Sequence, residues 1–334
     1  MKKIIIDADP GIDDSIAIIL ANNVAEYDIL GVSLVSGNVH AEKGRKNILR
    51  LSKFLNQDFK IYMGSTTPLT KEFINAEDTH GEDGLGETYL PYKEKNSDGD
   101  AIDFLVNEAR KGQLTIFVLG PLTNIARAIK RDRAAFKDTR IIIMGGNFKS
   151  HGNMSPVAEF NFYVDPDAAD YVIKNAPNKV EILPLDVTRK FVLTPSILSY
   201  MKRLNLEVGN FVEKITNFYM DFHWEYEKII GSVINDPLTI IAERKPELFR
   251  SRTFNAECIT DGPARGMLMV DEMDFMKREK NIILYEDLDV YEVWKYFLEE
   301  ITKSEVDEKV LGDLLWKLLQ KKSPFSHFAL PWIW

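Results

Sequence analysis

The sequence contains a single cysteine, Cys258, among its 334 residues. One cysteine excludes an intrachain disulfide and favours a reducing compartment, so we expect a cytoplasmic protein.

An excess of basic residues is also missing, because 42 Lys and Arg stand against 51 Asp and Glu and give a formal net charge of −9. An acidic chain does not attract a phosphate backbone, so we expect no nucleic acid polymer as a partner.

Long hydrophobic runs, linkers and repeats are missing as well. No run approaches the roughly 18 apolar residues of a membrane-spanning helix, and the apolar run at residues 4–6 ends at Asp7, too early for a signal peptide. We therefore expect no membrane association.

The composition predicts one α/β domain over residues 1–304, followed by a C-terminal helix and an aromatic tail over 305–334. Aromatic side chains are costly to leave in water, so we expect the tail to pack on the domain or on a neighbouring subunit.

The most informative segment is residues 4–14, where three isoleucines lead into four carboxylates. The four acidic residues are Asp7, Asp9, Asp13 and Asp14. The apolar run predicts a short buried strand, a Pro-Gly turn follows it, and the next residues predict a helix that starts near Asp13, Asp14 or Ser15. Ligands of open α/β sheets lie beyond the carboxyl ends of the strands, where this loop would be.

Four carboxylates at one strand end need compensation, because like charges a few ångströms apart raise each other's pKa or bind a cation. Hard oxygen ligands from one tight loop favour Ca²⁺ or Mg²⁺. The segment contains no Cys or His, which disfavours a site for a soft metal. For any single aspartate, the alternative is a structural role at the positive end of the helix.

The rest of the chain alternates between predicted strands and helices. Strands are predicted over 29–36, 59–64, 114–119, 140–144 and 180–183, and helices over 41–55, 100–111, 122–131, 194–203, 207–228, 289–302 and 305–320. This βαβ pattern predicts a mostly parallel sheet, with a late hairpin formed by 255–260 and 266–271. The polar, glycine-containing loop over 74–98 is long enough to suggest a functional role.

Polar residues follow several of these strands and precede one late helix. They lie at Asp9 to Asp14, Asn38, Thr123, the stretch 147–161, and Asn235-Asp236. A doubly wound sheet would bring them to one rim, where carboxylates and amides could hold a metal and a polyhydroxylated ligand such as a sugar. For an isolated asparagine, a turn is the alternative.

The run Asp7-Ala8-Asp9-Pro10-Gly11-Ile12-Asp13-Asp14 resembles the N-terminal signature of the inosine-uridine-preferring nucleoside hydrolases. The resemblance extends over nearly the whole chain. It implies an α/β fold with an open, mostly parallel central sheet flanked by helices, a Rossmann-like core. It also implies Ca²⁺-dependent hydrolysis of the N-glycosidic bond of a ribonucleoside substrate, and a homo-dimer or homo-tetramer.

The resemblance further implies roles for individual residues. Asp9 would be the general base that takes a proton from a Ca²⁺-bound water, and it would also touch the metal. The other implied metal ligands are Asp14, the backbone carbonyl of Thr123, and Asp236. Asn38 would steady the region of the nucleophile, and Asp7 would support the site.

The implied sugar contacts come from two parts of the chain. Asp13 would bond the 2′-hydroxyl. Asn153 and Glu159, in the stretch Gly-Asn-x-x-Pro-x-x-Glu-x-Asn, would hold the 5′-hydroxyl side. Asn161, which ends that stretch, would contact the lower hydroxyls.

One position departs from the family pattern, because Asn235 stands where the family carries a histidine thought to assist the departing base. Asparagine has no proton that titrates near neutral pH. His80 or His223 could supply the proton instead, or the base could stack on aromatic residues. The aromatic candidates are Trp224, Tyr226 and Phe222. A third possibility is that the protein binds nucleosides and turns them over poorly.

Two other functions compete with this interpretation. One is a Ca²⁺-dependent nucleoside-binding protein without catalysis. The other is a phosphatase of the haloacid dehalogenase type, in which Asp7 would be the nucleophile and Mg²⁺ the metal. The Asp13-Asp14 pair has no place in the phosphatase scheme, and no late lysine with paired aspartates completes it.

Overall fold

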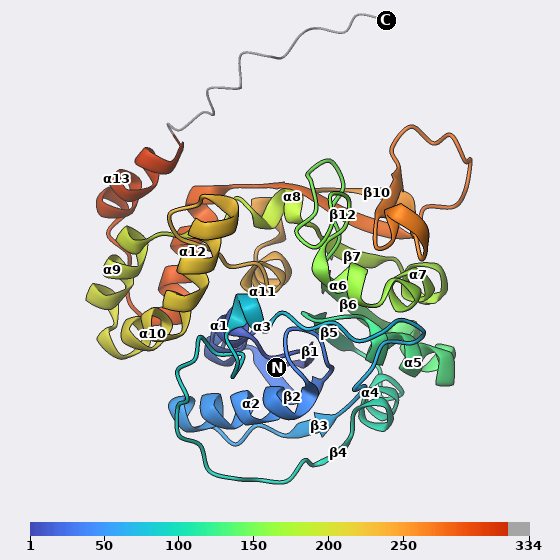
Figure 1. Cartoon of the computed structure of the whole chain (residues 1–334), viewed down its shortest axis with the longest axis horizontal. Helices are drawn as coiled ribbons and strands as arrows, with labels where there is room; N and C mark the ends of the chain where they lie inside the picture. Colours follow the sequence, from blue (N-terminus) through green and yellow to red (C-terminus); the bar gives the residue numbers. More distant parts are fainter. Residues whose placement is uncertain (320–334) are drawn as a thin grey trace, which may run out of the picture.

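The structure is a computed structural model that describes residues 1–319. Its centre is a ten-stranded sheet in the order β11-β10-β12-β7-β6-β5-β1-β2-β3-β4 (Figure 1). The strands are β1 (Lys2–Ala8), β2 (Tyr27–Leu34), β3 (Ile61–Met63), β4 (Gly99–Asp100), β5 (Leu114–Val118), β6 (Thr139–Met144), β7 (Val180–Leu183), β10 (Phe249–Cys258), β11 (Leu268–Asp271) and β12 (Ile282–Leu288).

Neighbouring strands from β4 to β12 run parallel, and β10, next to the edge strand β11, runs antiparallel to both β12 and β11. This arrangement confirms the open, mostly parallel sheet and the late hairpin that the sequence predicts. β1 lies between β2 and β5, inside the sheet. The carboxyl end of β1 is therefore enclosed by the ends of its neighbours.

Helices cover both faces of the sheet (Figure 1). They are α1 (Ile12–Asn23), α2 (Ala41–Leu55), α3 (Glu77–His80), α4 (Ala101–Ala109), α5 (Thr123–Arg131), α6 (Phe160–Val164), α7 (Pro166–Asn175), α8 (Leu185–Thr188), α9 (Pro195–Leu204), α10 (Leu206–Phe222), α11 (Pro237–Arg244), α12 (Val290–Thr302) and α13 (Glu308–Leu319). A small two-stranded sheet pairs β8 (Val192–Leu193) with β9 (Ser232–Val233).

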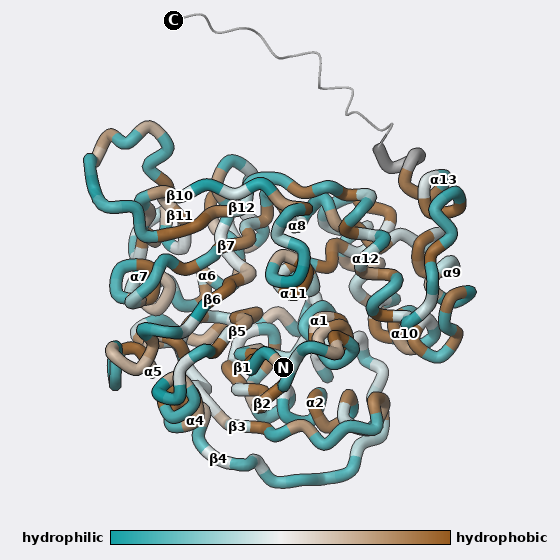
Figure 2. The backbone as a smooth tube through the Cα atoms, turned by 180° about the vertical axis from the view of Figure 1, so that it is seen from behind, coloured by the Kyte–Doolittle hydropathy of each residue, from teal (hydrophilic) through white to brown (hydrophobic). Residues whose placement is uncertain are grey.

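Two hydrophobic cores form because successive side chains of a strand point to opposite faces. Ile4 and Ile6 of β1 belong to the core under α1, α2 and α9 to α13, whereas Ile5 belongs to the core under α4, α5 and α7. The strands carry hydrophobic stretches, and much of the outer surface is hydrophilic (Figure 2). Leu311 and Leu315 of α13 are buried in the first core. The C-terminal helix therefore packs on the α/β body.

The predicted helix over 207–228 is only partly α-helical. α10 ends at Phe222 and continues as a π-helical turn over His223–Glu227. Lys228 then adopts a left-handed conformation with φ 58°, which ends the helical segment. The prediction for the aromatic tail concerns residues that lie outside the described part of the chain. Among the described residues, no helix is both long and apolar enough to cross a membrane.

Candidate active site

The segment that carries the first four aspartates has the predicted local structure. β1 ends at Ala8, and α1 begins at Ile12 with Gly11 as its N-cap. The carboxylate of Asp14 accepts a hydrogen bond from the Gly11 backbone N–H at 3.0 Å, and Ser15 Oγ donates to the Gly11 carbonyl at 2.6 Å. These contacts fix the turn, so that the acidic side chains lie at the carboxyl end of the central strand.

Asp9 occupies a tight space between neighbouring strand ends. Its Oδ2 accepts a hydrogen bond from the Asn38 backbone N–H at 2.6 Å, whereas its Oδ1 has no hydrogen-bond partner among residues 1–319. A Cβ at Gly37 would lie 2.0 Å from Asp9 Oδ2, and a Cβ at Gly120 would lie 2.5 Å from Asp9 Oδ1. Only glycine at these two positions leaves room for the carboxylate.

Three further carboxylates converge beside Asp9. One oxygen each from Asp13, Asp14 and Asp236 lies within 4.8 Å of the others. Burial, together with the charge of Asp13, raises the pKa of Asp14 to about 7. Burial raises the pKa of Asp236 well above its usual range, and the other aspartates of the cluster add to this effect.

The cluster fits a divalent cation. Burial, followed by the charge of Asp14, raises the pKa of Asp9 well above its usual range. Asp9 Oδ1 and Asp14 Oδ1 are buried without a hydrogen-bond partner in the described part of the chain. Buried carboxylates without partners are unfavourable as anions unless a cation compensates them. Carboxylate oxygens are the donors that Ca²⁺ and Mg²⁺ prefer, so this donor set matches a hard metal ion.

A cavity of about 590 Å³ opens above the cluster. Most of the predicted site residues line it, namely Asp13, Asn38, His80, Asn153, Glu159, Asn161, Asn235 and Asp236. Asp9 and Asp14 do not line the cavity and are completely buried beside its floor. The cavity thus brings together four of the five segments that the strand-end argument names, namely those of Asp13, Asn38, the stretch 147–161 and Asn235-Asp236, and adds His80 of α3.

Thr123 Oγ1 donates to Asp165 Oδ2 at 2.6 Å, and the residue does not line the cavity. The role predicted for its backbone carbonyl stays a prediction. Leu119, which follows β5 directly, lines the cavity, and its carbonyl accepts a hydrogen bond from Asn161 Nδ2 at 2.7 Å. The backbone oxygen at this strand end is therefore that of Leu119. Its apolar side chain gave no signal of a polar role.

Trp224, predicted to contact the base, is placed elsewhere. It does not line the cavity, and 56% of its surface is exposed. The cavity wall is formed instead by Tyr219, Phe222, His223 and Tyr226. These four share one face of α10 and its π-helical turn, at the spacing of successive helical turns. Trp224 lies on the opposite face. Tyr219 was missed, although its spacing from Phe222 and Tyr226 could have indicated it.

The predicted sugar contacts already have protein partners. Asn153 Oδ1 accepts the Phe160 N–H at 2.9 Å. Glu159 caps α6, and its two oxygens accept the backbone N–H groups of Gly146, Asn161 and Phe162. Burial nevertheless raises the pKa of Glu159 to about 7. These contacts hold the cavity-lining loop in a fixed conformation.

Asn235 and the two histidines form the side of the cavity next to Asp13. Asn235 Nδ2 donates to Asp13 Oδ2 at 3.1 Å, which orients that carboxylate. His80 Nδ1 accepts the Ile12 N–H at 3.1 Å, so the ring is protonated on Nε2 when it is neutral. His223 Nδ1 lies 2.8 Å from the Tyr219 carbonyl, and its Nε2 accepts the Val233 N–H at 3.4 Å. Burial lowers the pKa of both histidines.

Asp7 lies within β1 and is completely buried, and it does not line the cavity. Its Oδ1 accepts hydrogen bonds from Ser33 Oγ and from Asn124 Nδ2. These contacts agree with the supporting role that the resemblance implies, and that role stays a prediction.

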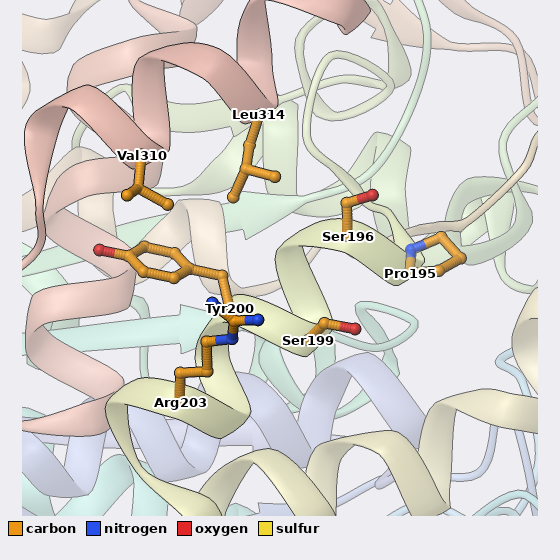
Figure 3. Close-up of a pocket in the computed structure, with 7 residues that line it drawn as sticks. All are labelled: Pro195, Ser196, Ser199, Tyr200, Arg203, Val310 and Leu314. Carbon is orange, nitrogen blue, oxygen red and sulfur yellow. The ribbon is translucent and has the colours of Figure 1, made fainter.

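A second hollow of about 380 Å³ lies between α9 and α13 (Figure 3). Its lining residues are Pro195, Ser196, Ser199, Tyr200, Arg203, Val310 and Leu314. No carboxylate lines it among the described residues. The cavity at Asp13 and Asp236 is the candidate active site, because these two residues and Asp14 form a converging group that could hold a metal ion.

Known proteins resemble this chain over most of its length. Residues 4–295 match the family model described as inosine-uridine preferring nucleoside hydrolase. Uridine nucleosidase 1 of Arabidopsis thaliana is 35% identical over 277 residues, which cover 81% of this chain and 82% of that protein. Pyrimidine-specific ribonucleoside hydrolase RihB of Shigella flexneri is 30% identical over 284 residues, which cover 84% of this chain and 90% of that protein.

Solved structures agree with this match. A purine-preferring ribonucleoside hydrolase from Gardnerella vaginalis has a TM-score of 0.85 and 29% identity, with 90% of this chain and 98% of that chain covered. A plant nucleoside hydrolase also has a TM-score of 0.85, with 30% identity and coverage of 90% and 99%. The fold, the aspartate cluster and the match over residues 4–295 lead to the same conclusion. This chain belongs to the inosine-uridine preferring nucleoside hydrolase family.

Proposed function

We propose that this N-ribosyl hydrolase cleaves the N-glycosidic bond of ribonucleosides with the help of Ca²⁺ held by Asp9, Asp14 and Asp236. The observation that carries the proposal is the convergence of Asp13, Asp14 and Asp236 within 4.8 Å of one another, with Asp9 buried next to them, at a cavity of about 590 Å³. When bound, Ca²⁺ would activate a water molecule and provide contacts for the sugar hydroxyls.

The aspartates also supply the proton transfer and the electrostatic stabilisation. Asp9 Oδ1 has no hydrogen-bond partner in the part of the chain that the structure describes, and it would accept a proton from the attacking water. The cluster of carboxylates stabilises positive charge that develops on the ribosyl ring as the bond to the base breaks. Asp13, oriented by Asn235, is in place to accept a hydrogen bond from a sugar hydroxyl.

The departing base requires a proton donor, and His80 fits this role better than His223. Within the described chain, His80 forms a hydrogen bond only through Nδ1. Because His80 lines the cavity, its Nε2–H is left to donate to a ligand bound there. His223 uses both ring nitrogens in contacts with backbone groups. Tyr219 stacks on His80 with ring centroids 5.2 Å apart, so the donor and the aromatic wall are adjacent.

Hydrolysis of p-nitrophenyl riboside, inosine and uridine before and after exhaustive chelation tests the proposal. We expect chelated protein to lose at least 10²-fold in rate, and Ca²⁺ to restore the activity. Ca²⁺ should also raise the free energy of unfolding, by about 2.7 kcal/mol at a concentration of 100 times its dissociation constant. Full activity of chelated, folded protein would contradict the metal role. Absence of hydrolysis by Ca²⁺-loaded protein, with tight nucleoside binding, would favour a binding protein.

A further inference from the structure

Arg189 follows α8 and lines the cavity between two of its walls. Its Nη1 donates to the His151 carbonyl, and its Nη2 donates to the Gly152 carbonyl at 3.2 Å. The same Nη2 lies 4.0 Å from Glu227 Oε1. One guanidinium group thus contacts a loop on one side of the cavity and the π-helical turn on the other.

The first contact belongs to a larger attachment of the loop over residues 148–152. The carboxylate of Asp186, on α8, accepts the backbone N–H groups of Phe148, Lys149 and Ser150 at 2.7 to 2.8 Å. Asp186 and Arg189 therefore hold the two ends of this loop to α8. The loop leads directly into Asn153, which lines the cavity.

The second contact reaches the aromatic wall. Glu227 is the last residue of the π-helical turn, and Tyr226 and His223 of the same turn line the cavity. The Arg189 and Glu227 side chains are only 17% and 25% exposed. Charge pairs in such partly buried surroundings are screened less than exposed pairs. The contact with Arg189 can therefore hold the turn in place.

A direct role of Arg189 in binding an anionic substrate agrees less well with these contacts. Two carbonyls and a carboxylate already surround its guanidinium group. Burial lowers the pKa of Arg189, and Glu227, Asp186 and Glu159 are the acidic groups that act against this effect. The side chain is therefore directed to protein partners on both sides.

We propose that Arg189 is a positioning residue that ties the 148–152 loop to the π-helical turn and so sets the width of the cavity where the base is held. The proposal deepens the proposed function and rests on it for the identity of the ligand. The attachment itself is a property of the protein and can be measured without turnover.

Hydrogen–deuterium exchange of the full chain tests the attachment directly. Arg189→Gln removes the contacts to both walls, so we expect exchange to become at least fivefold faster in residues 148–154 and 223–233. Glu227→Gln leaves the bonds from Arg189 to the two carbonyls, so the increase should be confined to 223–233. Glu225→Gln is the matched control, because Glu225 lies on the same turn and does not line the cavity. Unchanged exchange of 223–233 in both the Arg189 and Glu227 variants would overturn the proposal.

Steady-state kinetics then test the consequence for the substrate. In Arg189→Gln we expect KM for inosine and uridine to rise roughly tenfold, equivalent to about 1.4 kcal/mol, with kcat changed by less than about threefold. Arg189→Lys should not restore KM, because a compact ammonium group cannot bond both walls at once. A fall of kcat by roughly tenfold with unchanged KM would overturn the positioning role. If no variant or wild-type protein hydrolyses nucleosides, the proposed function fails, and the exchange results still decide the attachment.

Discussion

At the scale of single residues, the site depends on which polar atoms are left without protein partners. His80 donates no hydrogen bond within the described chain, because its one hydrogen bond there is the Ile12 N–H that Nδ1 accepts. Asp9 Oδ1 is one of several buried polar atoms without a hydrogen-bond partner in the described part of the chain. The position of His80 in the cavity lining and of Asp9 beside the other aspartates favours these two groups for proton transfer.

His80→Asn tests the proton donor. The Oδ1 of asparagine can accept the Ile12 N–H in place of Nδ1, whereas the Nε2–H is lost. We expect kcat for inosine and uridine to fall by roughly 10²-fold or more, with little change for p-nitrophenyl riboside, whose leaving group departs without protonation. His223→Asn is the comparison variant and should lose less. The reverse order of effects would assign the proton donor to His223.

The sequence indicated the site residues that contribute through their polar side chains. Asp9 to Asp14 form a contiguous acidic motif, and a strand followed by a turn fixes where it lies. Leu119 contributes through its backbone carbonyl, which no side-chain pattern can indicate. Trp224 was predicted at the cavity from its aromatic character alone. The phase of the π-helical turn, which the sequence does not specify, directs it outward.

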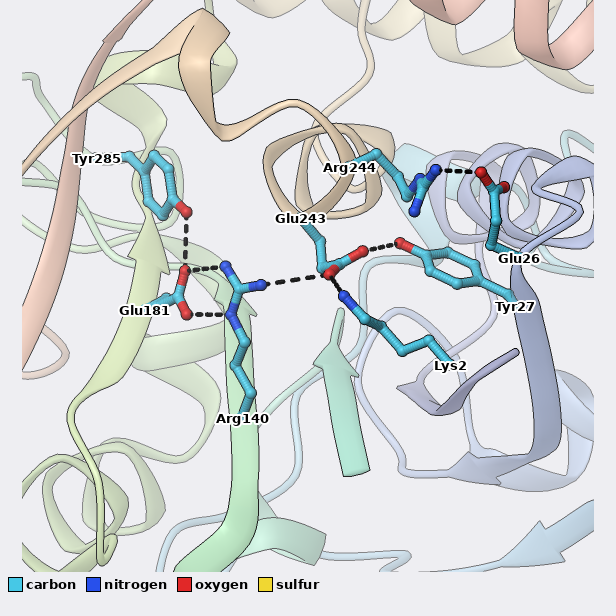
Figure 4. Close-up of polar contacts among 8 residues, drawn as sticks. All are labelled: Lys2, Glu26, Tyr27, Arg140, Glu181, Glu243, Arg244 and Tyr285. Carbon is cyan, nitrogen blue, oxygen red and sulfur yellow. Dashed lines mark hydrogen bonds and ion pairs between the residues drawn. The ribbon is translucent and has the colours of Figure 1, made fainter. Parts of the chain in front are cut away.

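At the scale of elements, α11 joins the active site to a charged network at the opposite edge of the sheet, where β1, β2, β6 and β7 begin (Figure 4). Asp236 occupies the N-cap position of α11, and Glu243 lies near its C-terminus. Glu243 is paired with Lys2 and with Arg140, and it accepts a hydrogen bond from the Tyr27 hydroxyl. The predicted helix start at Asn235-Asp236 was correct. The contacts that hold the other end of α11 come from strands β1, β2 and β6. Such long-range contacts leave no local pattern.

Glu243→Gln should destabilise the protein strongly. Removal of one charge from a buried network leaves its partners uncompensated, so we expect the free energy of unfolding to fall by about 3 kcal/mol. Urea unfolding measures this change. Glu247→Gln, at an exposed position three residues beyond α11, should change stability by less than about 0.5 kcal/mol. Equal stabilities of the two variants would show that the network contributes nothing.

At the scale of the whole molecule, buried tyrosines link stability to alkaline pH. Tyr27 and Tyr285 donate to Glu243 and Glu181, and burial and these carboxylates raise the pKa of both phenols. Burial also raises the pKa of Tyr296 to about 12. The native state therefore keeps phenol protons that the unfolded chain loses above about pH 10.

The sign of this effect follows from the protons bound in each state. Above about pH 10 the unfolded chain binds fewer protons, so the free energy of unfolding falls as the pH rises, by roughly 1.4 kcal/mol per pH unit for each such tyrosine. Urea unfolding at several pH values between about 8 and 11 measures the slope. Tyr285→Phe should reduce the slope by the contribution of one tyrosine. A slope that does not differ between this variant and wild type would contradict the linkage.

The sequence predicted the class of the sheet but not its strand order. Local patterns identify the parallel βαβ units, whereas the pairing of β7 with β12 joins segments about a hundred residues apart. That pairing is decided by packing across the whole chain. The central position of β1, between β2 and β5, likewise emerges only from the complete sheet.

The division of the cavity between two kinds of structure has a consequence for how such enzymes diversify. Asp9 directly follows the interior strand β1, Asp13 and Asp14 lie in α1, and Asp236 precedes α11, so a change there disturbs elements packed in the core. The aromatic wall belongs to one continuous segment, from Tyr219 to Val233, in which Tyr219 is buried and Tyr226 is exposed. Substitutions within this segment can alter which base is accepted while the aspartates that act on the glycosidic bond stay unchanged.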